Sequence, residues 1–269
     1  VSFVATAYYF YALKYLVKSA EMVGNKYDAV LYSTLAEKVR NVLNTKFFNS
    51  ETKQYATGSQ TANAMAVYMD IVESENKQAV LNNLVNDIKV HGNRLTTGDI
   101  GNRYLFQTLA TNGLNELMYK MFNHEEAPGY GFQLKFGATT LTEQWDPRQG
   151  ASWNHFMLGQ IDEWFFASLA GIQTDPKQLG MKHLIIKPEP VGDLKFVKAS
   201  TQTQYGKVTV EWNLHQTDPD CTKGINIFTL KVTLPEHCTA DVYLPWTNKP
   251  EHASAGVNTF EISEEPCMF

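Results

Sequence analysis

Glu143 is the residue best placed to do chemistry, because a run of β-branched residues delivers its carboxylate between a glutamine and a tryptophan. His155 follows twelve positions later, preceded by Trp153 and Asn154 at the start of an apolar stretch. An Asp-Pro pair at 146–147 can turn the chain back, so a carboxylate, an indole and an imidazole can face one pocket. Positioned carboxylates transfer protons, and aromatic rings stack on the apolar faces of sugars. The pattern indicates carbohydrate chemistry.

The composition is that of a globular protein that binds a neutral substrate. The chain has 269 residues, a formal net charge of -5 and no cluster of lysine and arginine. These values argue against a phosphate backbone as ligand, so no nucleic-acid partner is expected. The 43% hydrophobic content supports one large domain with a smaller one.

The sequence also argues against cofactor and metal chemistry. Cys221, Cys238 and Cys267 form no CxxC pair, and their spacing allows one disulfide without requiring any. No zinc motif, nucleotide-binding loop or Ser-His-Asp order stands out. Lys14 and Lys18 interrupt the first apolar stretch before it could cross a bilayer, so membrane insertion is not expected. The compartment is left open, with a periplasmic or secreted location favoured over the cytoplasm.

From the N-terminus to about residue 170 the apolar residues recur at helical spacing, and consecutive helices are expected to pair antiparallel. The segment 123–151 breaks this pattern. It is rich in Gly, Pro and Thr and too long for an ordinary connection, which predicts a functional loop that contains Glu143. We expect helices over 2–23, 27–48, 59–72, 75–90, 99–110, 115–122 and 153–170, the last apolar nearly all round and buried.

Past Pro176 the period changes to two, which predicts strands. The run 201–212 predicts a β-hairpin that turns at a Tyr-Gly pair. Residues 1–175 are therefore expected to form an α-helical catalytic part, and residues 176–269 a C-terminal antiparallel β-sandwich. Further strands are expected at 183–187, 194–200, 225–234, 239–244 and 257–263.

Several motifs together resemble the α-L-rhamnosidases of glycoside hydrolase family 78, in order and over nearly the whole chain. The resemblance implies an (α/α)6 toroid of paired helices followed by a β-sandwich, and inverting hydrolysis of terminal α-L-rhamnosides. The motifs are Gly98 to Gly101 with Tyr104, Thr139 and Thr140, Glu143 to Asp146, Asn154-His155, Gly159, Glu163-Trp164, Gly171-Ile172, and the Tyr205-Gly206 hairpin with Trp212.

The resemblance also implies roles. Glu143 would be the general base that deprotonates the attacking water, and His155 would hydrogen-bond sugar hydroxyls. The family's general acid lies in an acidic segment early in the toroid, and no equivalent cluster occurs between Val1 and Gly98. About seven helices, against the twelve of a whole toroid, agree with an incomplete barrel. The chain is therefore expected to be a C-terminal part that lacks the acid, with its upstream part on the same polypeptide.

Other candidate residues have plain structural interpretations as well. Asp99 can cap its helix, although the matching family loop approaches the sugar, so it is kept as a binding candidate together with Asn154. Trp145 and Trp153 can fill a core or supply a stacking wall. The spacing places Asp162 on one helix face with His155, which predicts a polar stripe facing the pocket.

Two alternative functions remain at this stage. The chain could belong to another (α/α) barrel glycosidase acting on glucosides or uronides, and a pocket rich in arginine and lysine would favour uronides. It could instead be a non-catalytic carbohydrate-binding fragment, which would bind rhamnose without turnover.

Overall fold

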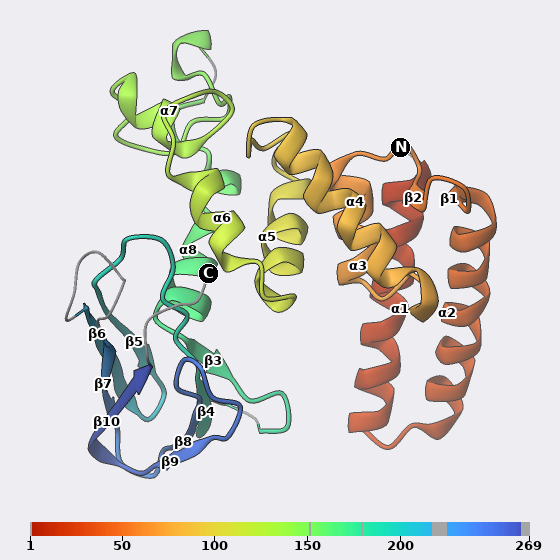
Figure 1. Ribbon diagram of the computed structural model, residues 1–269. Coiled ribbons are helices and arrows are strands. Elements are labelled where there is room, and N and C mark those ends of the chain that lie inside the picture. The colour runs from red at the N-terminus through yellow and green to blue at the C-terminus, as the bar shows by residue number, and fades with distance from the viewer. Residues whose placement is uncertain (1, 151, 179, 217–224, 265–269) are drawn as a thin grey trace. The chain divides into compact units, whose positions relative to one another are not determined.

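The computed structural model describes residues 2–150, 152–178, 180–216 and 225–264. The chain forms two compact units, Val1–Gln160 and Ile161–Phe269. The first is mainly helical and the second mainly β (Figure 1). The prediction of a helical part followed by a β-sandwich is confirmed. The compact units divide earlier than the boundary expected after residue 175.

In the helical unit the first helix packs on the second, the third on both the fourth and the fifth, and the fifth on the sixth. Asn25 ends the turn after the first helix, and its side-chain oxygen accepts a hydrogen bond from the Asp28 backbone N–H at 3.1 Å. Such a cap satisfies a donor at the start of the second helix. The elements are α1 (Ser2–Met22), α2 (Lys26–Phe47), β1 (Phe48–Asn49), β2 (Gln54–Tyr55), α3 (Gln60–Tyr68), the 3-10 turn Ser74–Asn76, α4 (Lys77–Val90), α5 (Gly101–Thr111), α6 (Asn115–Phe122) and α7 (Tyr130–Lys135).

The helix α3 is buried along most of its length, and its polar side chains hold the neighbouring loop. The Gln60 side chain is fully buried. Its Nε2 donates to Asp87 Oδ2 at 3.0 Å and to the Arg94 carbonyl at 3.2 Å, while its Oε1 accepts from the Thr96 N–H at 3.0 Å. Because buried polar groups need partners, this one side chain fixes the start of the loop that leads to Asp99.

The prediction of one buried helix over 153–170 is wrong. Residues 152–155 are not helical, and three short pieces follow: the 3-10 turn Phe156–Leu158, α8 (Ile161–Trp164) and a π-helical turn at Phe165–Leu169. The His155 N–H donates to the Leu141 carbonyl, so this residue pairs with a distant segment and not with a helical turn. Phe156 is 80% exposed. The predicted polar stripe joining His155 to Asp162 therefore does not exist, because no helix connects them.

The second unit contains two four-stranded sheets, ordered β10-β7-β6-β5 and β3-β4-β8-β9. All neighbouring strands are antiparallel except β4 and β8, which pair parallel. The hairpin predicted at Tyr205-Gly206 is present, with Thr203 opposite Gly206. The strands are β3 (Ile172–Thr174), β4 (His183–Ile186), β5 (Phe196–Thr203), β6 (Gly206–Gln216), β7 (Asn226–Leu234), β8 (Thr239–Val242), β9 (Glu251–Ala253) and β10 (Gly256–Glu264).

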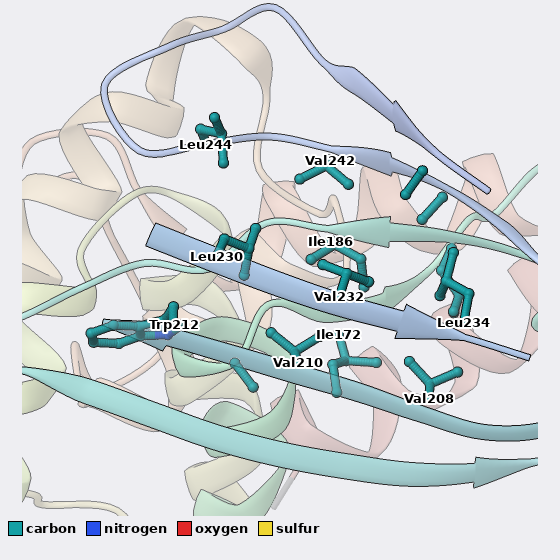
Figure 2. Packing of buried hydrophobic residues seen from close by; sticks show 14 of the residues in the cluster. Ile172, Ile186, Val208, Val210, Trp212, Leu230, Val232, Leu234, Val242 and Leu244 are labelled. Atoms are coloured by element: carbon teal, nitrogen blue, oxygen red, sulfur yellow. The ribbon is translucent and has the colours of Figure 1, made fainter. Parts of the chain in front are cut away.

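The sandwich core lies between these sheets (Figure 2). Ile186 from one sheet and Val210 from the other belong to the same cluster of buried side chains. Trp212 is fully buried, and its indole N–H donates to the Leu169 carbonyl at 2.7 Å. That bond ties the π-helical turn into the core. Cys238 is buried and unpaired, whereas Cys221 and Cys267 lie outside the described residues.

None of the helices in the described part of the chain is long and apolar enough to cross a membrane. Within the same residues, no group of three or more His, Cys, Asp and Glu side chains is arranged to hold a metal ion.

Candidate active site

The loop that carries Glu143 is closed on itself by backbone hydrogen bonds. The Glu143 N–H donates to the Ser152 carbonyl at 2.8 Å, and the His155 N–H donates to the Leu141 carbonyl at 2.8 Å. The Thr140 hydroxyl also donates to the backbone carbonyl of a residue on the second leg, Trp153. The segments 140–143 and 152–155 therefore lie side by side, and Glu143 and His155 share one tied loop.

The Glu143 side chain is exposed, and its backbone is held by the hydrogen bond to Ser152. Its Oε2 accepts a hydrogen bond from the Ser152 N–H at 3.2 Å. The neighbouring Gln144 carbonyl accepts from the Thr142 hydroxyl at 2.7 Å and from Gln133 Nε2 at 3.2 Å. A carboxylate that is oriented by a backbone hydrogen bond and is open to solvent can bind and deprotonate a water molecule.

His155 is paired with Asp99 across a long stretch of sequence. Its Nε2 lies 3.0 Å from Asp99 Oδ2, and the two side chains are 24% and 36% exposed. The helix α5 that follows Asp99 has no side-chain cap. The capping interpretation of Asp99 is therefore wrong, and the structure brings together two of the residues that the sequence singled out.

The two candidate tryptophans have different surroundings. Trp145 is half-buried: its indole N–H donates to the Thr97 carbonyl at 3.2 Å, and its ring meets the Tyr130 ring at 5.1 Å. Trp153 is 54% exposed, and Asn154 beside it is also exposed. Trp145 is thus held between Thr97 and Tyr130, while Trp153 and Asn154 present exposed side chains.

Asp146 is the carboxylate nearest to Glu143 in sequence, and it belongs to an ion pair. Arg148 donates to both Asp146 oxygens, each at 2.8 Å, and its guanidinium lies 3.9 Å from the Phe136 ring centre. The hydrogen bond from Arg148 holds the pKa of Asp146 below its ordinary value. A general acid must carry a proton, so Asp146 is poorly suited to that role.

Sequence reasoning missed the residues that support this site. Gln160 Nε2 donates to the Asp99 carbonyl at 3.1 Å, and the Tyr130 hydroxyl donates to the Leu158 carbonyl at 2.6 Å. The only available signal was the polar character of Gln160 beside an apolar run, which does not identify its partner. Asp162 and Glu163 lie on α8, in the second unit.

The helical part precedes a β-sandwich and carries an exposed carboxylate and a paired imidazole on one loop, an arrangement that agrees with the domain of helical hairpins that the family comparison identifies. The chain belongs to the bacterial α-L-rhamnosidases of glycoside hydrolase family 78. The family model for the bacterial alpha-L-rhamnosidase 6 hairpin glycosidase domain matches residues 1–169. That for the bacterial alpha-L-rhamnosidase C-terminal domain matches residues 171–258. The resemblance inferred from the sequence is confirmed.

Individual relatives agree with this assignment. An alpha-L-rhamnosidase of Formosa agariphila is 30% identical over 92% of the chain, and one of Streptomyces avermitilis is 26% identical over 98%. The chain spans about a quarter of the length of these curated relatives. Among solved structures, the alpha-L-rhamnosidase of Dictyoglumus thermophilum matches 96% of the chain with a TM-score of 0.83 and 28% identity, and the chain covers 31% of it. That of Aspergillus terreus matches 95% with a TM-score of 0.85 and 25% identity, with 30% of its own chain covered.

Proposed function

We propose that this chain forms the base-carrying part of an α-L-rhamnosidase that removes terminal rhamnose from glycosides with inversion of configuration. The observation that carries the proposal is the tied loop, which presents the Glu143 carboxylate and the His155 imidazole together. Family membership supports rhamnose as the sugar, because the relatives bear the name alpha-L-rhamnosidase. A periplasmic or secreted location suits an enzyme that meets such glycosides outside the cytoplasm, and it stays a prediction.

In this proposal Glu143 is the general base. An inverting glycosidase uses one carboxylate to activate water and a second carboxylic acid to protonate the leaving oxygen, with the two groups roughly 6.5–9.5 Å apart. Glu143 fits the first role because its side chain is exposed and its carboxylate is oriented by the Ser152 N–H. The acid is proposed to lie on the same polypeptide outside this chain, because the family's acidic segment has no equivalent between Val1 and Gly98. Asp146, which is paired with Arg148, is poorly suited to that role.

Other residues bind the sugar in this scheme. His155 forms a hydrogen bond with a sugar hydroxyl. Trp153 stacks on an apolar face of the sugar ring or of the leaving group. Asn154 adds a polar contact from the same exposed leg of the loop. Trp145 shapes the pocket from behind, held by the Thr97 carbonyl.

The proposal is tested with a panel of nitrophenyl glycosides and the full-length natural polypeptide. We expect release of nitrophenol from the α-L-rhamnoside well above that from glucosides and uronides. Proton NMR of the first product formed should show the β anomer, as inversion requires. Preference for a glucoside or uronide would identify a different barrel glycosidase, and rhamnose binding without turnover would identify a binding module.

A further inference from the structure

We infer that Asp99 is a positioning residue for His155: it fixes the imidazole so that only Nδ1 is left to bind the sugar. This inference rests on the proposed function, because it concerns the same rhamnose site. It differs from the expectation, drawn from the sequence, that Asp99 itself contacts the sugar.

The contact between the two side chains determines which nitrogen of His155 carries the proton. Asp99 Oδ2 lies 3.0 Å from His155 Nε2, and an ionised carboxylate can only accept a hydrogen bond. In a neutral imidazole the proton is therefore held at Nε2, and Nδ1 keeps its lone pair. Among the described residues the imidazole makes its hydrogen bond through Nε2 and none through Nδ1. It is thus an acceptor for a sugar hydroxyl.

The His155 ring is held at its backbone and at Nε2, so the direction of the Nδ1 lone pair is fixed. The backbone N–H of His155 is bound to the Leu141 carbonyl at 2.8 Å, which fixes the base of the side chain. Asp99 holds the far edge of the ring. The His155 side chain remains 24% exposed, which leaves room for a hydroxyl group to approach.

Asp99 is itself braced by the segment that carries His155. Gln160 Nε2 donates to the Asp99 carbonyl at 3.1 Å, and Trp145 Nε1 donates to the Thr97 carbonyl at 3.2 Å. Both donors lie near Glu143 or His155 in sequence. Three separate hydrogen bonds therefore connect the loop 97–99 with the segment 145–160. They hold Asp99 in place beside the imidazole ring of His155.

The first experiment replaces Asp99 with asparagine and measures L-rhamnose binding to the full-length natural polypeptide by calorimetry. The new amide can donate to Nε2, which favours the proton at Nδ1 and turns the acceptor into a donor. We expect Asp99→Asn to weaken binding by roughly ten-fold, the worth of about one hydrogen bond. His155→Ala should cause a similar loss, and the double variant should lose no more than His155→Ala alone.

A second measurement separates positioning from general damage to the site. Methyl L-rhamnosides that lack a single hydroxyl at O2, O3 or O4 are compared with the parent methyl rhamnoside. For the one sugar whose missing hydroxyl normally binds Nδ1, wild type and Asp99→Asn should bind equally. The other two sugars should keep the roughly ten-fold difference. A structural defect would reduce the binding of all of them alike.

Glu126→Gln is the matched control. Glu126 pairs with Arg94, which lies on the same loop as Asp99, and this ion pair does not involve His155. This variant should bind L-rhamnose like wild type. Losses in the double variant that multiply would mean that Asp99 contacts the sugar directly, and would overturn its positioning role. If wild type neither binds nor hydrolyses L-rhamnosides, the proposed function itself fails, which is a different result from wild-type binding with multiplying losses.

Discussion

Glu143 and Ser152 are joined by two hydrogen bonds, one in each direction. The Glu143 N–H donates to the Ser152 carbonyl at 2.8 Å, and the Ser152 N–H donates to Glu143 Oε2 at 3.2 Å. The same pair thus closes the loop and orients the carboxylate. Among the described residues the bond from the Ser152 N–H uses Oε2 and not Oε1, so Oε1 is the oxygen that we propose binds the water molecule.

The role of Glu143 predicts the effect of Glu143→Gln. Glutamine keeps the shape and can still accept from the Ser152 N–H, but its amide cannot take a proton from water. We expect kcat to fall by roughly two to four orders of magnitude with little change in KM, because a positioned base contributes about that much. Glu125→Gln, which removes an exposed carboxylate paired with Lys135, should leave kcat near wild type. Near-normal turnover of Glu143→Gln would refute the assignment.

His155→Ala should act mainly on binding. Loss of one hydrogen bond to a sugar hydroxyl should weaken inhibition by free L-rhamnose by roughly ten-fold. The matched control is His91→Ala, because His91 is a more exposed histidine that also has a carboxylate partner, Asp87, at 3.4 Å. Unchanged inhibition in His155→Ala, or an equal loss in the control, would count against the role of His155.

Trp212 is expected to dominate the stability of the sandwich. Trp212→Phe leaves the Leu169 carbonyl without its indole donor and should cost about 1–3 kcal/mol, and Trp212→Ala about 3–5 kcal/mol because of the cavity. Urea unfolding monitored by circular dichroism measures both. Trp246→Phe makes the same chemical change at a 43% exposed position and should alter stability by less than about 0.5 kcal/mol. Equal costs at the two positions would contradict this account.

His124 should make the loop 123–136 sensitive to acid. Burial, and then the nearby Arg94, lower the pKa of His124 below its ordinary value of 6.5. The unfolded loop therefore takes up a proton before the folded loop does, so the folded form loses stability as pH falls below about 6.5. In the folded loop Nδ1 accepts from the Glu126 N–H at 3.2 Å, and within the described chain Nε2 is buried without a partner.

Limited proteolysis of this loop at pH 7.5 and pH 5 measures that effect. Cleavage should rise at pH 5 in wild type. In His124→Asn it should change much less, because asparagine can accept the same backbone N–H but does not titrate. Glu125 and Glu126 are present in both proteins, so their titration cancels in the comparison. Equal pH dependence in the two proteins would exclude His124 as the cause.

Elements set by local sequence could be predicted well. The expected helix over 115–122 coincides with α6, and the hairpin at Tyr205-Gly206 is where the period of two and the glycine placed it. The expected helix over 153–170 was wrong because Leu141 supplies the partner for the His155 N–H, and no local pattern reports a bond to a distant residue.

The same distinction applies to the site. Residue types and spacing singled out Glu143, His155 and Asp99, but the sequence assigned Asp99 either to helix capping or to the sugar. Its contact with His155 joins positions 56 apart in the chain. Such a pairing depends on where the helices place the two loops, which propensity and periodicity do not encode.

The bond between Trp212 and Leu169 bears on how this family could exchange its domains. The two family models meet between residues 169 and 171, so a chimera spliced there would take the indole from one parent and its carbonyl acceptor from the other. A splice between Gln160 and Ile161 keeps both in the same inherited piece. The unit that can be transplanted intact is therefore the sandwich together with the short helical turns before it.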